Sequence, residues 1–230
     1  MDVRLAWAVP EMGHTWKTYK GVQRLVWNRE LKGGYANKYV PRVGLFRQFS
    51  AINTKPSRVD DAVLKFADEY GDITGLPGSS FYQLDETGER QIQRPNAPLK
   101  MWRFQIEQMR WAVGLWDRSN DEDLGKASRL EARKALQIEV DAALQDVKTP
   151  SCARVCVNAR LELFVHPVNL LAFMWLTLAR LLSGEIEERL CVGCRDKRVY
   201  IGSGPGLQRG NTVTCGPACR KRKQRGEAEV

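Results

Sequence analysis

The feature that most constrains the fold of this 230-residue chain is a group of four cysteines near its C-terminal end. They form two close pairs, with two residues inside the first pair, three inside the second and twenty between them. A segment of about 35 residues buries too little apolar surface to fold alone, so it needs a cross-link or a metal ion. This spacing is typical of a zinc site, because zinc prefers four soft donors in a tetrahedron. We therefore predict a structural Zn²⁺ bound by Cys191, Cys194, Cys215 and Cys219.

Two other interpretations of these cysteines stay open. Disulfides would need an oxidising compartment, and the first ten residues have neither the long apolar run nor the cleavage site of a secretory signal. A thioredoxin-like redox motif would explain the first pair but not the second. The remaining cysteines, Cys152 and Cys156, are expected to pack as buried apolar residues. His14 and His166 are isolated, and we expect structural or surface roles for both.

The positive charge of the chain is concentrated around the same cysteines. The net charge is +9, and residues 189–225 contain ten basic residues and one acidic residue, whereas residues 1–188 are nearly neutral. Such an asymmetry indicates a polyanionic partner, although a solvated tail without a specific role is the alternative. Tyr200 is the one aromatic residue of this segment, which favours contact with the phosphate backbone over stacking on single-strand bases. We expect DNA more than RNA as the nucleic-acid partner. The residues predicted to contact nucleic acid are Arg198, Arg209, Arg220, Lys221, Arg222, Lys223 and Arg225.

The hydrophobic pattern predicts an α+β fold with a mainly helical body, a few short strands and a small C-terminal zinc finger made of a hairpin and a short helix. We divide the chain into a body over residues 1–188, a finger with a basic tail over 189–225 and a disordered end over 226–230. Helices are predicted at 57–70, 98–117, 121–146 and 167–183, with glycines ending the first and last at Gly71 and Gly184. One or two strands are expected within 154–165, and mixed strands and loops within 1–56, where 40–52 contains β-prone pieces. Residues 71–98 are expected to form a loop that can hold a hairpin.

Three helices show an apolar face at helical spacing. The first comprises Val59, Val63, Phe66 and Ala67; the second Leu99, Trp102, Ile106, Met109, Val113 and Trp116; the third, which is weaker, Leu124, Ala127, Leu130, Ile138 and Ala142. Within the finger, residues 198–201 and 211–214 are β-prone pieces on either side of a glycine-rich turn. We expect these two pieces to pair as the hairpin of the finger.

The most apolar run of the chain covers the thirteen residues from Leu170 to Leu182 and contains Arg180. A membrane span needs about 18 or more apolar residues, so a buried helix is the better interpretation. We expect a cytoplasmic protein with reduced thiols and without a membrane partner.

The C-terminal third resembles bacterial proteins that end in a CGNR-like, treble-clef-like zinc finger. The resemblance is carried by HPVNLLAFMWLTLARLLSGE, by the C-x2-C pair and by CGPACRKRKQR, with LKFADEYGDI as a shorter upstream match. It implies a cytoplasmic zinc-binding protein with a DNA-binding or regulatory role. In that family a glycine often follows the second cysteine, where this chain has Arg195, and the letters CGNR do not occur here.

The sequence contains no strong catalytic signature, since it lacks H-E-x-x-H, G-x-S-x-G and a phosphate-binding Walker loop. A zinc ion closed by four thiolates leaves no position for substrate. Our leading hypothesis is a zinc-binding regulatory protein that contacts nucleic acid through its finger. The alternatives are a protein-interaction adaptor or homodimer that uses the finger or the tryptophan-rich body for docking, and an enzyme assembled from distant residues of the body.

Overall fold

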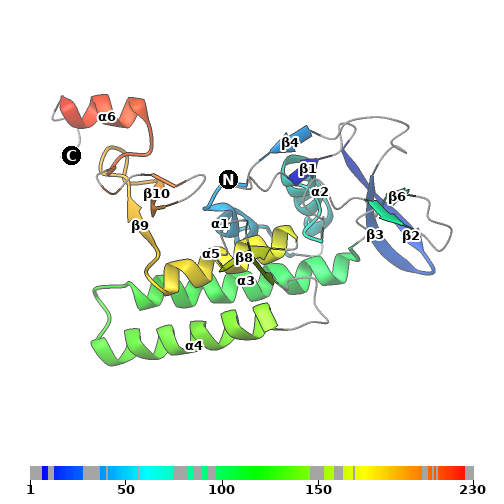
Figure 1. The fold of residues 1–230 in the computed structure, drawn as a ribbon, viewed down its shortest axis with the longest axis horizontal. Coiled ribbons are helices and arrows are strands. Elements are labelled where there is room, and N and C mark those ends of the chain that lie inside the picture. The colour runs from blue at the N-terminus through cyan, green and yellow to red at the C-terminus, as the bar shows by residue number, and fades with distance from the viewer. Residues whose placement is uncertain are drawn as a thin grey trace.

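The structure is a computed structural model, and it is α+β with a mainly helical body. It describes residues 7–9, 13–27, 37–39, 41–55, 57–74, 82–84, 90–92, 97–145, 153–157, 163–167, 169–203, 207–208, 210 and 212–225. Within these ranges lie six helices and five antiparallel strand pairs (Figure 1). The helices are α1 (Leu45–Ser50), α2 (Val59–Tyr70), α3 (Leu99–Ser119), α4 (Lys126–Gln145), α5 (Leu170–Leu182) and α6 (Pro217–Gln224).

Each strand pairs with one partner only among the described residues. The pairs are β1 (Trp7–Val9) with β4 (Asn37–Tyr39), β2 (His14–Tyr19) with β3 (Val22–Trp27), β5 (Tyr82–Leu84) with β6 (Arg90–Ile92), β7 (Ala153–Val157) with β8 (Leu163–Pro167), and β9 (Ile186–Leu190) with β10 (Arg198–Gly202). The strands predicted within 154–165 are confirmed by β7 and β8, and the hairpin expected within 71–98 by β5 and β6.

The core of the body is built around α3. All six residues of its predicted stripe are buried, with Trp102, Ile106 and Met109 fully inaccessible. The predicted face of α2 is also buried and packs on the same core, where Phe66 lies 6.2 Å from Trp102 between ring centroids. Gly71 follows α2 with φ of 89°, which confirms the glycine stop.

Two predictions about α1 and α4 are wrong. Residues 45–50 are helical and not β-prone strand, because a single turn buries Leu45, Phe46 and Phe49 together against α3 and α5. In α4 the buried face is Ala132, Leu136 and Val140, whereas the predicted Leu130 and Ile138 are 52% and 69% exposed. Packing against both α3 and α5 selects a face that includes the small Ala132, which allows close approach of the helices.

The chain enters the finger directly from α5. Asn169 caps the start of this helix by accepting a hydrogen bond from the backbone N–H of Ala172 at 2.8 Å. Pro167, predicted to open the helix, is the last residue of β8 instead. Gly184 ends α5 with φ of 80°, and β9 begins two residues later. None of the described helices has both the length and the apolar character required to cross a membrane.

The finger has a different hairpin from the predicted one. Residues 186–190 form β9, and β9 is the strand that pairs with β10. The predicted partner segment contains no strand in its described residues 212–214. The reason is that Ile186 joins the core of the body, which holds β9 beside β10. Figure 1 shows the finger at one end of the molecule and the β2–β3 hairpin at the opposite end, with α6 beyond β9 and β10.

Candidate metal centre

Four sulfur atoms converge at the end of the β9–β10 hairpin. The Sγ atoms of Cys191, Cys194, Cys215 and Cys219 all lie within 4.8 Å of one another. Cys194 Sγ lies 3.8 Å from Cys215 Sγ, which in turn lies 3.5 Å from Cys219 Sγ. Among the described residues, this is the one group of three or more side chains able to hold a metal ion together. The four predicted ligands therefore come together as a candidate metal centre.

The first cysteine pair sits on a tight turn that follows β9. The backbone N–H of Arg195 donates to the carbonyl of Cys191 at 2.8 Å, and the N–H of Cys191 donates to the carbonyl of Lys197 at 2.8 Å. Arg195 has φ of 55°, in the left-handed region that favours glycine. The first cysteine turn therefore holds a non-glycine residue in this left-handed conformation.

The second cysteine pair belongs to the start of α6. Cys215 precedes the helix, and Cys219 lies in its first turn, where Pro217 is favoured because it needs no hydrogen-bond acceptor. The two pairs are pressed together at Gly193, where a Cβ atom would lie 2.7 Å from the carbonyl oxygen of Cys219. Only glycine allows this close approach of the two backbones.

The pKa values of two of these thiols are shifted in opposite directions. Burial raises the pKa of Cys191, but backbone N–H donors outweigh burial and lower this pKa to about 6. One donor is the N–H of Cys215, 3.2 Å from Cys191 Sγ. Burial and the neighbouring thiol groups raise the pKa of Cys215 to about 12. The thiolate of Cys191 therefore forms easily, and its negative charge makes ionisation of the neighbouring thiols harder. A bound dication would remove this repulsion.

The finger has a small core of its own. Val199 and Ile201 of β10 are buried with Cys191 and Cys219, apart from the larger core of the body. This cluster is too small to hold a fold without a cross-link, as expected for a metal-dependent module.

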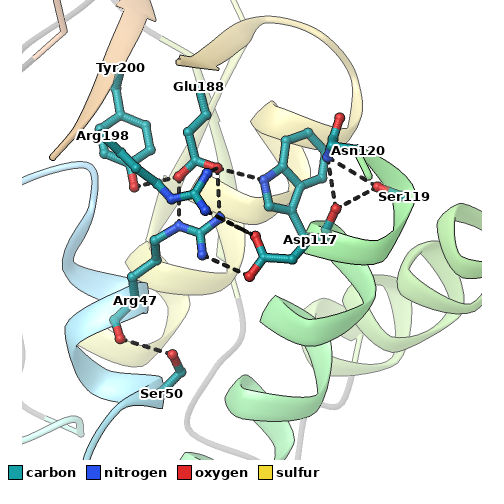
Figure 2. A network of polar contacts seen from close by, with 9 residues as sticks. Arg47, Ser50, Asp117, Ser119, Asn120, Glu188, Arg198 and Tyr200 are labelled. Carbon is teal, nitrogen blue, oxygen red and sulfur yellow. Dashed lines mark hydrogen bonds and ion pairs between the residues drawn. The ribbon is translucent and has the colours of Figure 1, made fainter. Parts of the chain in front are cut away.

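A buried carboxylate joins the finger to the body. The side chain of Glu188, on β9, is 3% exposed and accepts hydrogen bonds from three elements (Figure 2). Arg47 of α1 donates Nε to Oε1 and Nη2 to Oε2, both at 2.6 Å. Trp116 of α3 donates Nε1 at 2.8 Å, and Tyr200 of β10 donates its hydroxyl at 2.7 Å. The finger is therefore held at a defined position against α1 and α3.

A second carboxylate extends this network. Asp117 accepts from Arg47 at 2.7 and 3.1 Å, and it lies 3.6 Å from Nη2 of Arg198. Arg198 also donates Nη1 to Glu188 at 3.2 Å. Burial raises the pKa of Glu188, but Arg47 first, and Trp116 and Tyr200 after it, outweigh burial and lower that pKa. Burial and the carboxylate of Glu188 raise the pKa of Tyr200, so this phenol stays protonated and donates. Arg47 and Arg198 thus neutralise the carboxylates of Glu188 and Asp117 inside the interface.

The residues predicted to contact nucleic acid occupy different environments. Arg220, Lys221 and Lys223 are exposed on α6, and no ion pair is seen for them within the part of the chain that the structure describes. Arg222 instead donates Nη1 to the carbonyl of Gly193 at 3.2 Å, which ties α6 to the first cysteine turn. Arg225 caps the C-terminal end of α6.

The other two predicted contact residues differ from those on α6. Arg198 directs its guanidinium to Glu188 and Asp117, inside the finger–body interface. Arg209 lies outside the described residues. The predicted contact residues other than Arg198 and Arg209 therefore lie on α6 or at its end, whereas the exposed Arg195 and Lys197 lie on the first cysteine turn.

Sequence reasoning missed the Glu188 network. The signal was the acidic run that follows α5, which stood out against a strongly basic finger. Its partner Arg47 lies 141 residues away, so spacing could not identify the pair. The side chains of Cys152, Cys156 and His166 lie outside the described residues.

His14 is a buried structural residue at the opposite end of the molecule. Its side chain is 1% exposed, and Nδ1 lies 3.0 Å from Oδ1 of Asp68. Burial lowers the pKa of His14, and Asp68 and Asp72 offset only part of this shift.

The chain matches no protein-family model, no curated protein and no solved structure. The resemblance to CGNR-like fingers therefore stays a prediction.

Proposed function

We propose that the four cysteines bind a structural Zn²⁺ in the reducing cytoplasm. Zinc–sulfur bonds of about 2.3 Å in a tetrahedron require sulfur atoms about 3.8 Å apart. The separations of 3.8 and 3.5 Å, within a cluster no wider than 4.8 Å, fit this requirement. Four thiolates also leave no open position on the metal, so the ion has a structural role. It would hold α6 on the end of the β9–β10 hairpin.

We propose further that the finger contacts nucleic-acid phosphates, in DNA before RNA, as part of a regulatory protein. The observation that carries this proposal is the exposure of Arg220, Lys221 and Lys223 on a helix anchored by a metal ligand, Cys219. An anchored helix presents cations at lower entropic cost than a free tail does. Each phosphate that these cations neutralise would release counterions and strengthen binding at low salt.

A second candidate function is protein docking, and one observation favours it. Leu190 is 52% exposed and Val192 is 38% exposed, on either side of the buried Cys191. Exposed apolar residues on a rigid finger suit a protein partner, but two side chains form a small patch. We therefore rank this candidate second.

The test is fluorescence anisotropy of labelled duplex DNA and duplex RNA with the zinc-loaded full chain at 50 and 150 mM salt. The comparison is the variant R220Q/K221Q/K223Q, which leaves Arg222 and all four cysteines in place. We expect the wild-type chain to bind, and the variant to lose about 2.7 from the slope of log K against log salt. Zinc content measured on both proteins controls for folding of the finger. Absence of wild-type binding to either duplex at 50 mM salt would refute the proposal.

A further inference from the structure

The surface of the finger contains a groove between α6 and the segment that precedes Cys215. Its volume is about 680 Å³, and its wall includes Arg220, Lys223 and Gln224 on one side and Thr212 and Thr214 on the other. No acidic side chain lines it among the described residues. This groove lies beside the metal centre but does not include any of its ligands.

The helical spacing of α6 divides its cations between two faces. Arg220 and Lys223 are three residues apart and therefore neighbours on one face, the face of the groove. Arg222 points to the other side, where it donates to the carbonyl of Gly193 beside the cysteines. A Zn²⁺ with four thiolates carries a formal charge of about −2, which the guanidinium of Arg222 would partly offset. Arg222 therefore supports the metal centre, and Arg220 and Lys223 are available to a ligand.

The opposite wall of the groove has a fixed position. The N–H of Val192 donates to the carbonyl of Val213 at 3.0 Å, which ties the segment 212–214 to the first cysteine turn. Thr214 is 5% exposed, so the residue next to Cys215 packs into the finger. Hydroxyl groups of threonine and amide groups of glutamine commonly complement arginine and lysine around a phosphate. Both walls are thus anchored to the same four cysteines.

We infer that this groove binds a phosphodiester segment of the nucleic-acid backbone, with Arg220 and Lys223 as its cations. The inference rests on the proposed function and deepens it, because it assigns the phosphate contact to two groove residues and not to every cation of the finger. The arrangement of two cations along one wall of a groove matches an extended polyanion better than a flat charged face does. Lys221, on another face of α6, and Lys197, on the first cysteine turn, are not part of the groove.

The test compares two double variants that remove the same total charge. R220Q/K223Q removes the groove cations, and K197Q/K221Q removes two exposed cations outside the groove. At 150 mM salt we expect the groove variant to bind duplex DNA at least about tenfold more weakly and to lose about 1.8 from the salt slope. The matched control is expected to lose less than half as much in log K. Zinc content confirms that both variants keep the metal centre.

The outcomes separate the inference from the proposed function. If the wild-type chain binds DNA but both double variants lower the affinity equally, only the total positive charge matters. The assignment of the groove as the binding site is then wrong. If the wild-type chain binds no duplex, the proposed function and the groove both fail. Titration of ¹⁵N-labelled protein gives an independent measure, since DNA should shift the amide resonances of Thr212 and Thr214. A saturable shift of these resonances by inorganic phosphate but none by DNA would assign the groove to free phosphate and overturn the inference.

Discussion

Arg47 and Glu188 form a bidentate ion pair that joins the first helix of the body to the finger. Nε of Arg47 lies 2.6 Å from Oε1 of Glu188, and Nη2 lies 2.6 Å from Oε2. The two side chains are 18% and 3% exposed, so solvent screens this pair only weakly. These contacts hold the finger against the body, and α6 lies on the far side of β9 and β10 from α3 and α4 (Figure 1).

Replacement of Glu188 by glutamine should loosen this attachment. Glu188→Gln leaves Arg47 with an amide in place of its buried counter-charge, and we expect a loss of about 3 kcal/mol in the free energy of unfolding at pH 7. Because the pKa of Glu188 is lowered in the fold, its contribution is present above pH 4.5 and is lost as the pH falls through the folded-state value. Urea unfolding at pH 7 and at pH 3 measures both effects. An equal difference between wild type and variant at the two pH values would contradict this prediction.

The packing of Tyr200 on Gly44 gives a second test of the same interface. A Cβ atom on Gly44 would lie 2.8 Å from Cε2 of Tyr200, whereas a Cβ atom on Gly114 would meet nothing within 4 Å. Gly44→Ala should therefore displace Tyr200 and cost about 1–3 kcal/mol of stability. Gly114→Ala, in the exposed interior of α3, should instead stabilise the protein by about 0.5–1 kcal/mol. Thermal unfolding of both variants checks the opposite signs, and two shifts of the same sign would count against the interface.

Metal binding should require glycine at position 193 but not at position 216. Gly193→Ala would place a Cβ atom 2.7 Å from the carbonyl oxygen of Cys219, so the two cysteine pairs could not approach. We expect at least about tenfold weaker zinc binding, the usual effect of disturbing the surroundings of metal ligands. Gly216→Ala is the matched control, because its Cβ would meet nothing within 4 Å. Competition with a zinc-binding dye measures both affinities, and equal affinities would show that the close approach is unimportant.

Removal of the metal should unfold the finger and leave the body folded. The reason is that Cys191, Val199, Ile201 and Cys219 form a core separate from that of the body. Cys219→Ser or a chelator should release one zinc per chain, while far-UV circular dichroism keeps the helical signal of α2 to α5. Loss of most of that signal on chelation would mean that the body also depends on the metal.

The buried His14 should make stability fall in mild acid. Its folded-state pKa is lowered, so its contribution is fully present above about pH 6.5 and is lost as the pH falls through the folded-state value. Protonation would charge a ring whose Nε2 is buried without a hydrogen-bond partner among the described residues. His14→Asn keeps a donor for Asp68 but does not titrate. Urea unfolding between pH 7.5 and 5.5 should give a flatter profile for the variant, and parallel profiles would exclude this role.

Local sequence patterns were sufficient to predict the cysteine cluster and two of the buried helix faces. The cysteine cluster could be predicted because a four-cysteine site depends on short spacings within each pair, and these spacings do not depend on the rest of the fold. The buried faces of α2 and α3 followed from helical periodicity, since each face is long and strongly apolar.

The tertiary structure decided the rest, because those features depend on partners far away in the sequence. The predicted apolar face of α4 is not the buried one, because contact with α3 and α5 buries the face with Ala132 and Leu136. The strand β10 was correctly expected, but its partner is β9, held in place where Ile186 enters the core of the body. The role of Glu188 arises only in the fold, where Arg47 and Trp116 donate hydrogen bonds to its carboxylate. Spacing along the chain encodes which residues can act together locally, whereas burial and charge pairing across the chain decide which of them remain exposed for a partner.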